Sequence, residues 1–125
     1  MDAPTQREER GLHNPAIIDL ITTDPATEEV VLVMLQRRDW VEGAAQVAEL
    51  QEKFNSYFDY VTMGHLVKEY PKYAETRVRI QLEYRTEPPA ILVETLEQAE
   101  RIGRKFRIGV SVAPIADGRV APWEK

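Results

Sequence analysis

Two short polar segments hold the residues of this chain whose types could bind a ligand. Arg38, Asp39 and Trp40 follow an apolar run, and Arg85 and Glu87 follow an alternating one. Paired arginines beside an aromatic ring and a helix start could hold a small anion or a carboxylate of a partner. Alternatively, Trp40 packs under the start of the helix, Asp39 or Glu42 interacts favourably with the helix dipole, and the arginines are solvated. The sequence favours this alternative, because no known catalytic pattern accompanies these residues.

Three further groups of polar residues could do chemistry, each with a simpler explanation. Asp39 and Glu87 could act as paired carboxylates, although two acids in neighbouring loops are a common coincidence. His65, next to Gly64, could make a pH-sensitive contact or could face solvent. A basic cluster could meet a phosphate, although positive charge is expected at a helix C-terminus. This cluster comprises Arg101, Arg104, Lys105 and Arg107.

The composition excludes several classes of function. The 125 residues fit one domain, and a chain with 43% hydrophobic and 30% charged residues can form a core without disulfides or metal ions. There is no cysteine, and the two histidines, His13 and His65, are isolated, so we expect neither a metal site nor a cofactor. The net charge of −5 argues against nonspecific nucleic-acid binding.

Location is predicted from two expected absences. The first ten residues are charged and lack the apolar core of a secretory signal. The longest apolar run is too short to cross a bilayer. We therefore expect a cytoplasmic protein with no membrane partner.

The hydrophobic pattern predicts six elements between mobile tails at residues 1–14 and 114–125. An unbroken apolar run is typical of a strand buried on both faces, and a period of three to four residues is typical of a helix. We expect strands at 16–22, 29–36, 77–85 and 106–112, and helices from Gly43 to Tyr70, kinked at Gly64, and from Pro89 to Gly103.

This order, β-β-α-β-α-β, predicts a single α+β domain over residues 15–113. The first two strands should form a hairpin, and each later strand should be reached through a helix. The predicted architecture is a two-layer sandwich in which two helices cover one face of a four-stranded mixed sheet.

The other face of the predicted sheet is apolar, which suggests that something covers it. If Val30, Leu32 and Met34 face the helices, the intervening residues face away. The tail that carries Trp123 or a second copy of the chain could cover this stripe. Tyr57 and Tyr60, beside the core stripe of their helix, could extend an interface, although partial burial in the core is the simpler explanation for this group of tyrosines. The predicted apolar stripe comprises Ile17, Ile21, Val31, Val33 and Leu35.

Several segments resemble a small bacterial family of domains of unknown function. The resemblance extends from about Ile17 to Val112 and leaves both tails outside. It implies a compact cytosolic bacterial domain and no catalytic residue. The segments that carry it are residues 18–21, 24–25, 29–34 with Trp40, 50–53, 64–71 and 78–82.

Three functions remain open from the sequence. The first is a noncatalytic protein-interaction module that forms a homodimer. The second is a small-ligand-binding protein or minor enzyme that uses the edge containing Arg38, Asp39, Trp40 and Arg85. The third is an acidic, immunity-type inhibitor of a basic protein, suggested by charge and size alone.

Overall fold

The structure is a computed structural model, and it describes residues 11–40 and 45–115. β2 (Glu29–Gln36) pairs antiparallel with β1 (Leu20–Asp24) and parallel with β3 (Val78–Tyr84). β4 (Ile108–Pro114) pairs parallel with β3, which gives the order β1-β2-β3-β4. The predicted α+β fold with a four-stranded mixed sheet is confirmed.

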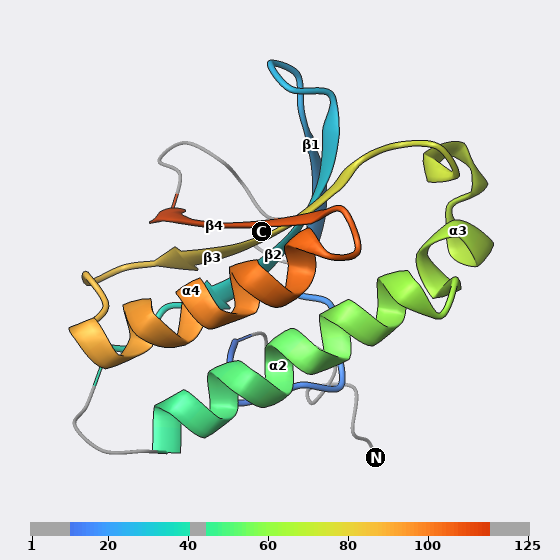
Figure 1. The fold of residues 1–125 in the computed structure, drawn as a ribbon. Helices are drawn as coiled ribbons and strands as arrows, with labels where there is room; N and C mark the ends of the chain where they lie inside the picture. The colour runs from blue at the N-terminus through green and yellow to red at the C-terminus, as the bar shows by residue number, and fades with distance from the viewer. Residues whose placement is uncertain (1–10, 41–44, 116–125) are drawn as a thin grey trace, which may run out of the picture.

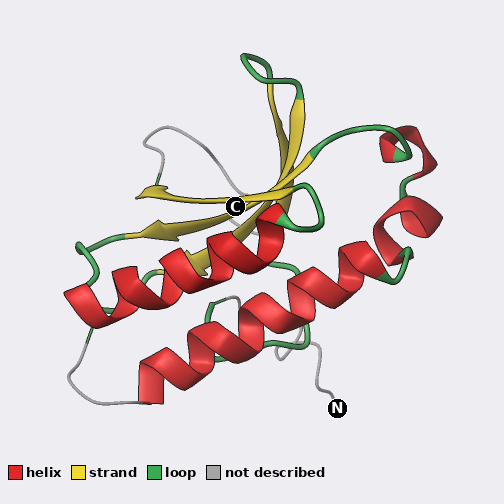
Figure 2. Ribbon diagram, viewed as in Figure 1, coloured by secondary structure: helices red, strands yellow, loops and turns green. Residues whose placement is uncertain are grey.

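Two long helices, α2 (Ala45–Thr62) and α4 (Ala90–Arg104), cover one face of the sheet (Figure 1). The predicted kink lies where expected, because Gly64 has a φ of 86° and separates α2 from a short helix α3 (His65–Glu69). A 3-10 turn (Pro71–Tyr73) then leads to β3. The described chain therefore has a third helix that the sequence pattern merged with the first (Figure 2).

The main core lies between the sheet and the two long helices. Alternate strand residues, such as Leu32, Ile80 and Leu82, meet Leu50 and Leu96 from the helices, and all are buried. Burial of each such side chain contributes roughly 1.5–3 kcal/mol of transfer free energy. None of the helices in the described residues is both long enough and apolar enough to cross a membrane.

The N-terminal segment differs from its prediction. Leu12, which we placed in a mobile tail, is fully buried in the main core. β1 begins at Leu20 rather than at Ala16, because the carbonyls of Asn14 and Ile17 accept hydrogen bonds from Lys53 instead of from a strand. The predicted tail thus fails for residues 11–14, and residues 1–10 lie outside the described part of the chain.

The C-terminal boundary also moves outward. β4 extends to Pro114, and Ile115 donates a backbone hydrogen bond to Tyr84 at 2.9 Å. The proposed cover by the tail that carries Trp123 lies outside the described residues.

The stripe on the far face of the sheet is buried, which corrects the predicted dimer contact. Val31, Val33 and Leu35 are 2, 0 and 3% exposed and form a second apolar cluster with Leu20 and Ile115 packed against it. An exposed surface for a second copy is therefore not present at these three residues.

Ile21 and Ile17 do not belong to that stripe. Because Ile21 pairs with Leu32, its side chain lies on the helix side and packs against the main core. Ile17 precedes β1 and lines a hollow of about 510 Å³ together with Ile18 and Tyr60. The one-residue difference in strand register places Leu20 where we expected Ile21.

Candidate functional site

The structure brings the two predicted ligand-binding segments together at the carboxyl ends of β2 and β3. The indole Nε1 of Trp40 donates to the carbonyl of Thr86 at 2.7 Å. The carboxylate of Asp39 accepts hydrogen bonds from the hydroxyl of Thr86 at 3.0 Å and from Arg85 at 3.4 Å. The hydrogen bond from Thr86, followed by the hydrogen bond and positive charge of Arg85, lowers the pKa of Asp39 from its ordinary value. These contacts link the two loops to each other.

The remaining predicted ligand residues are divided between this edge and the helix beside it. Arg38 forms an ion pair with Glu49 of α2 at 2.7 Å, so its guanidinium is turned along the helix. Glu87 is exposed, whereas the carboxylate of Asp39 is engaged by Thr86 and Arg85. The geometry gives no support to a pair of carboxylates acting together.

A buried amide lies directly beneath this edge. Gln36 is the last residue of β2, its backbone carbonyl accepts a hydrogen bond from Arg85, and its side chain has no exposed surface. Within the described part of the chain, neither polar atom of its side chain has a hydrogen-bond partner. Leaving a buried amide without a hydrogen bond costs about 1–3 kcal/mol, which a bound water molecule or ligand would recover. The sequence pattern does not distinguish Gln36 from the rest of its strand.

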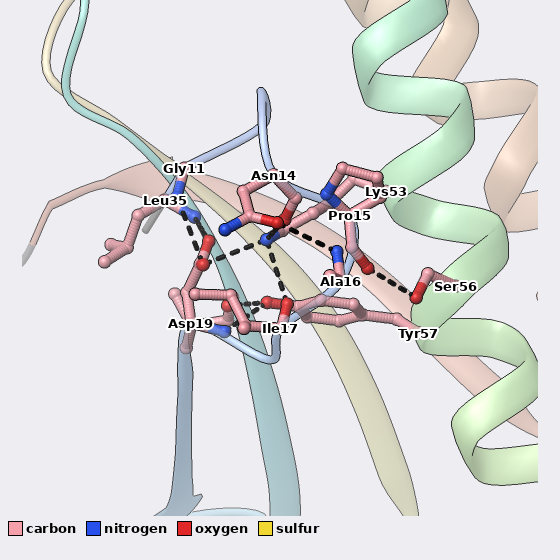
Figure 3. Close-up of polar contacts among 11 residues, drawn as sticks. Gly11, Asn14, Pro15, Ala16, Ile17, Asp19, Leu35, Lys53, Ser56 and Tyr57 are labelled. Carbon is pink, nitrogen blue, oxygen red and sulfur yellow. Dashed lines mark hydrogen bonds and ion pairs between the residues drawn. The ribbon is translucent and has the colours of Figure 1, made fainter. Parts of the chain in front are cut away.

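A buried ion pair joins the N-terminal segment to α2 (Figure 3). Lys53 and Asp19 have fully buried side chains and approach to 2.9 Å. The ammonium also donates to the carbonyls of Asn14 and Ile17, which occupies its three N–H groups. The carboxylate of Asp19 accepts backbone hydrogen bonds from Gly11 and Leu35. Sequence reasoning missed this pair, although a lysine one residue before Phe54 on a core-facing helix was a signal.

Tyr57 belongs to the same network, which corrects its predicted place at an interface. It is completely buried, its hydroxyl donates to the carbonyl of Val33 at 2.6 Å, and it accepts from the N–H of Asp19 at 2.7 Å. Because every one of these groups is enclosed and paired, the network stabilises the fold and offers no surface to a substrate.

Tyr60 lies at the margin of the hollow beside α3. Its hydroxyl donates to the carboxylate of Glu69 at 2.5 Å, and its ring stacks on His65 with centroids 6.3 Å apart. Burial, followed by the hydrogen bond to Glu69 and then the negative charge of Glu69, raises the pKa of Tyr60 well above its ordinary value. His65 is exposed and is held against an aromatic ring, and its role as a pH-sensitive contact stays a prediction.

The predicted basic cluster is an exposed surface at the end of α4. Arg104 forms an exposed i,i+4 ion pair with Glu100 at 3.5 Å, and Arg101, Lys105 and Arg107 are exposed as well. Exposed pairs of this kind add about 0–1 kcal/mol. The geometry agrees with charges that complement a helix C-terminus.

Exposed apolar side chains lie on α4, on β4 and in the turn between them. In the described residues, Ile91, Val93, Ile102, Phe106 and Val112 are five of the eight large apolar residues with substantial exposure, at 36–54%. A groove of about 240 Å³ runs between α2 and α4 over the side chains of Phe54 and Leu96.

β4 adds an open edge to this apolar region. It is the last strand of the sheet in the described chain, and none of its seven residues is charged. An uncharged edge strand presents unpaired backbone groups to any strand that can approach it. The alternation in the sequence predicts the strand but not its place at the edge of the sheet.

Comparison with known proteins identifies a family and no relative of established function. Residues 11–115, most of the chain, match a family described only as a family of unknown function, DUF6572. No curated protein and no solved structure gives a significant match. The expected resemblance to a family of domains of unknown function is confirmed, and the chain belongs to the DUF6572 family.

Proposed function

We propose that this chain is a noncatalytic protein-interaction module that self-associates, most simply as a homodimer. The observation that carries the proposal is the apolar surface beside the uncharged edge strand β4, where Val93 of α4 and Val112 of β4 are 36% and 44% exposed. Exposed apolar residues that cluster on one part of a surface are typical of interaction sites. The interface that we propose therefore differs from the buried stripe predicted from the sequence.

The polar residues support an interaction role over a catalytic one. Lys53 and Asp19 are enclosed and paired with each other, so they act within the fold. Asp39 and Arg85 are engaged across two loops. The chain has no cysteine, which suits the reducing cytoplasm that we propose as its location.

The direct test is the molar mass of the purified chain by light scattering across a dilution series at low and high salt. We expect a mass near twice 14.4 kDa that falls on dilution and changes little with salt, because apolar contacts are weakly screened. A constant mass of one chain at every concentration would contradict self-association. A complex with a basic protein that dissociates at high salt would instead support the inhibitor hypothesis, which is based on charge and size alone.

The second candidate is a small anion bound at the edge beside Asp39, and the unpartnered amide of Gln36 favours it. A Trp123→Phe chain leaves Trp40 as the only tryptophan. Titration of this chain with phosphate and with acetate should then quench Trp40 fluorescence. The response should disappear in Arg85→Ala and persist in Arg101→Ala, which removes an exposed arginine from α4. An unchanged spectrum with both anions would contradict this candidate.

A further inference from the structure

The backbone groups of β4 point to two sides, and among the described residues only one of these sides meets another strand. The N–H of Ile115 donates to the carbonyl of Tyr84 on β3. Alternate residues of a strand direct their backbone N–H and C=O groups to the same side, so those of residues 109, 111 and 113 also point toward β3. The N–H and C=O groups of Val110 and Val112 therefore point away from the sheet. Within the described chain no strand lies on that side.

The free side of β4 lacks the features that usually protect an edge strand. No lysine or other charge interrupts it, and Pro114, whose nitrogen cannot donate, stands only at its end. The opposite edge differs, because β1 has five residues and ends at Asp24, which pairs with Arg79 at 3.1 Å. Pairing is therefore expected at β4 rather than at β1.

Helix α4 adds apolar surface beside this edge. Leu92 and Leu96 face the sheet, and Thr95 and Ile102 line the groove toward α2. At 100° per residue, Val93 projects to the opposite side of α4, toward the flank of β4. Val93 and Val112 are 36% and 44% exposed. A chain that paired with β4 would cover both.

We propose that β4 pairs antiparallel with β4 of a second copy across a twofold axis, through the backbone groups of Val110 and Val112. This inference rests on the proposed self-association and names its surface. An uncharged strand is compatible with its own copy, and antiparallel pairing about a twofold axis satisfies both strands in the same way. It joins the two sheets into one and leaves the short, charged β1 at each end.

The first test compares Val112→Lys and Val112→Pro with Ile102→Lys. The lysine places a charge on the edge, and the proline removes an N–H that β3 does not use. Ile102 is similarly exposed, at 48%, but lies on the other side of α4, so it is the matched control. By sedimentation velocity we expect both Val112 variants to weaken the dimer at least ~10-fold. The Ile102 variant should behave as the unmodified chain.

A milder change keeps the inference testable if those variants fail to fold. The chain has no cysteine, so Val112→Cys introduces a single thiol. Residues opposite or diagonal across paired strands lie within about 8 Å, so a short bis-maleimide should link two such chains. The Ile102→Cys chain should remain unlinked.

The outcomes separate the two proposals. A monomeric unmodified chain would contradict self-association itself. Pairing at β4 would be overturned, with self-association left standing, by a dimer that survives both the lysine and the proline at position 112. The same conclusion would follow if the bis-maleimide linked the Ile102→Cys chain and failed to link the Val112→Cys chain.

Discussion

Residue-scale chemistry in this chain is concentrated in a buried network rather than on its surface. Lys53→Met would leave the carboxylate of Asp19 buried without its cation. Removing one partner of a buried pair typically costs about 3–5 kcal/mol. Chemical denaturation should show a loss of this size in the free energy of unfolding, whereas Lys68→Met, at an exposed lysine, should change little. A loss below about 1 kcal/mol would show that the pair is not enclosed in solution.

Gln36 predicts the opposite behaviour. Replacing an unpartnered buried amide with an apolar group of similar size removes a desolvation cost. Gln36→Leu should therefore leave the free energy of unfolding unchanged or raise it, and the exposed Gln98→Leu serves as control. A loss above about 1 kcal/mol would reveal a bound water molecule or ligand on the amide.

Tyr60 makes stability depend on alkaline pH. Its pKa is raised in the folded chain by burial and by Glu69, whereas in the unfolded chain it should be near 10. The stabilisation is therefore complete below about pH 10 and is lost as the pH rises toward the folded value. Denaturation between pH 8 and 11 should show this decline, and Tyr60→Phe should reduce it. Equal pH profiles for the two chains would exclude the Glu69 contact.

At the scale of elements, hydrophobic periodicity was the reliable signal. It placed β2 at residues 29–36 because a strand covered on both faces needs no alternation. It failed for β1, because the boundary there depends on hydrogen bonds from Lys53, a residue distant in sequence. It also merged α2 with α3, since apolar spacing continues across Gly64 while the backbone does not.

The predicted core face of α2 has a direct test. Phe54 is 4% exposed and belongs to the main core. Phe54→Ala should cost ~3–5 kcal/mol of unfolding free energy, by lost transfer energy and a residual cavity. The neighbouring Asn55→Ala, at an exposed position, should cost less than about 0.5 kcal/mol. Similar losses at both positions would mean that the helix is rotated relative to the sheet.

At the scale of the whole molecule, the alternation of side chains along β2 identified the far face of the sheet but not the residues that cover it. The sequence did place Asp39, Trp40 and Arg85 at one edge, because the ends of parallel strands converge there. The sequence could not identify β4 as an edge strand, because hydrophobic periodicity predicts where strands are but not their order in the sheet.

The burial of Val33 changes the expected outcome of a substitution there. With no exposed surface, Val33→Glu should bury a charge and abolish cooperative unfolding rather than release a folded monomer. The exposed Thr23→Glu on neighbouring β1 should keep a normal transition. Circular dichroism during heating distinguishes an unfolded variant from a folded one. A folded Val33→Glu monomer would support the dimer contact that was predicted from the sequence at this face of the sheet.

The most direct measurement of pairing at β4 is amide hydrogen exchange on the unmodified chain at high and low concentration. The amides of Ser111 and Ala113, bonded within the sheet, should be protected at both concentrations. The amides of Val110 and Val112 should be protected only at high concentration, where the two copies pair. Fast exchange of the Val110 and Val112 amides in a sample whose mass is that of a dimer would contradict pairing at β4.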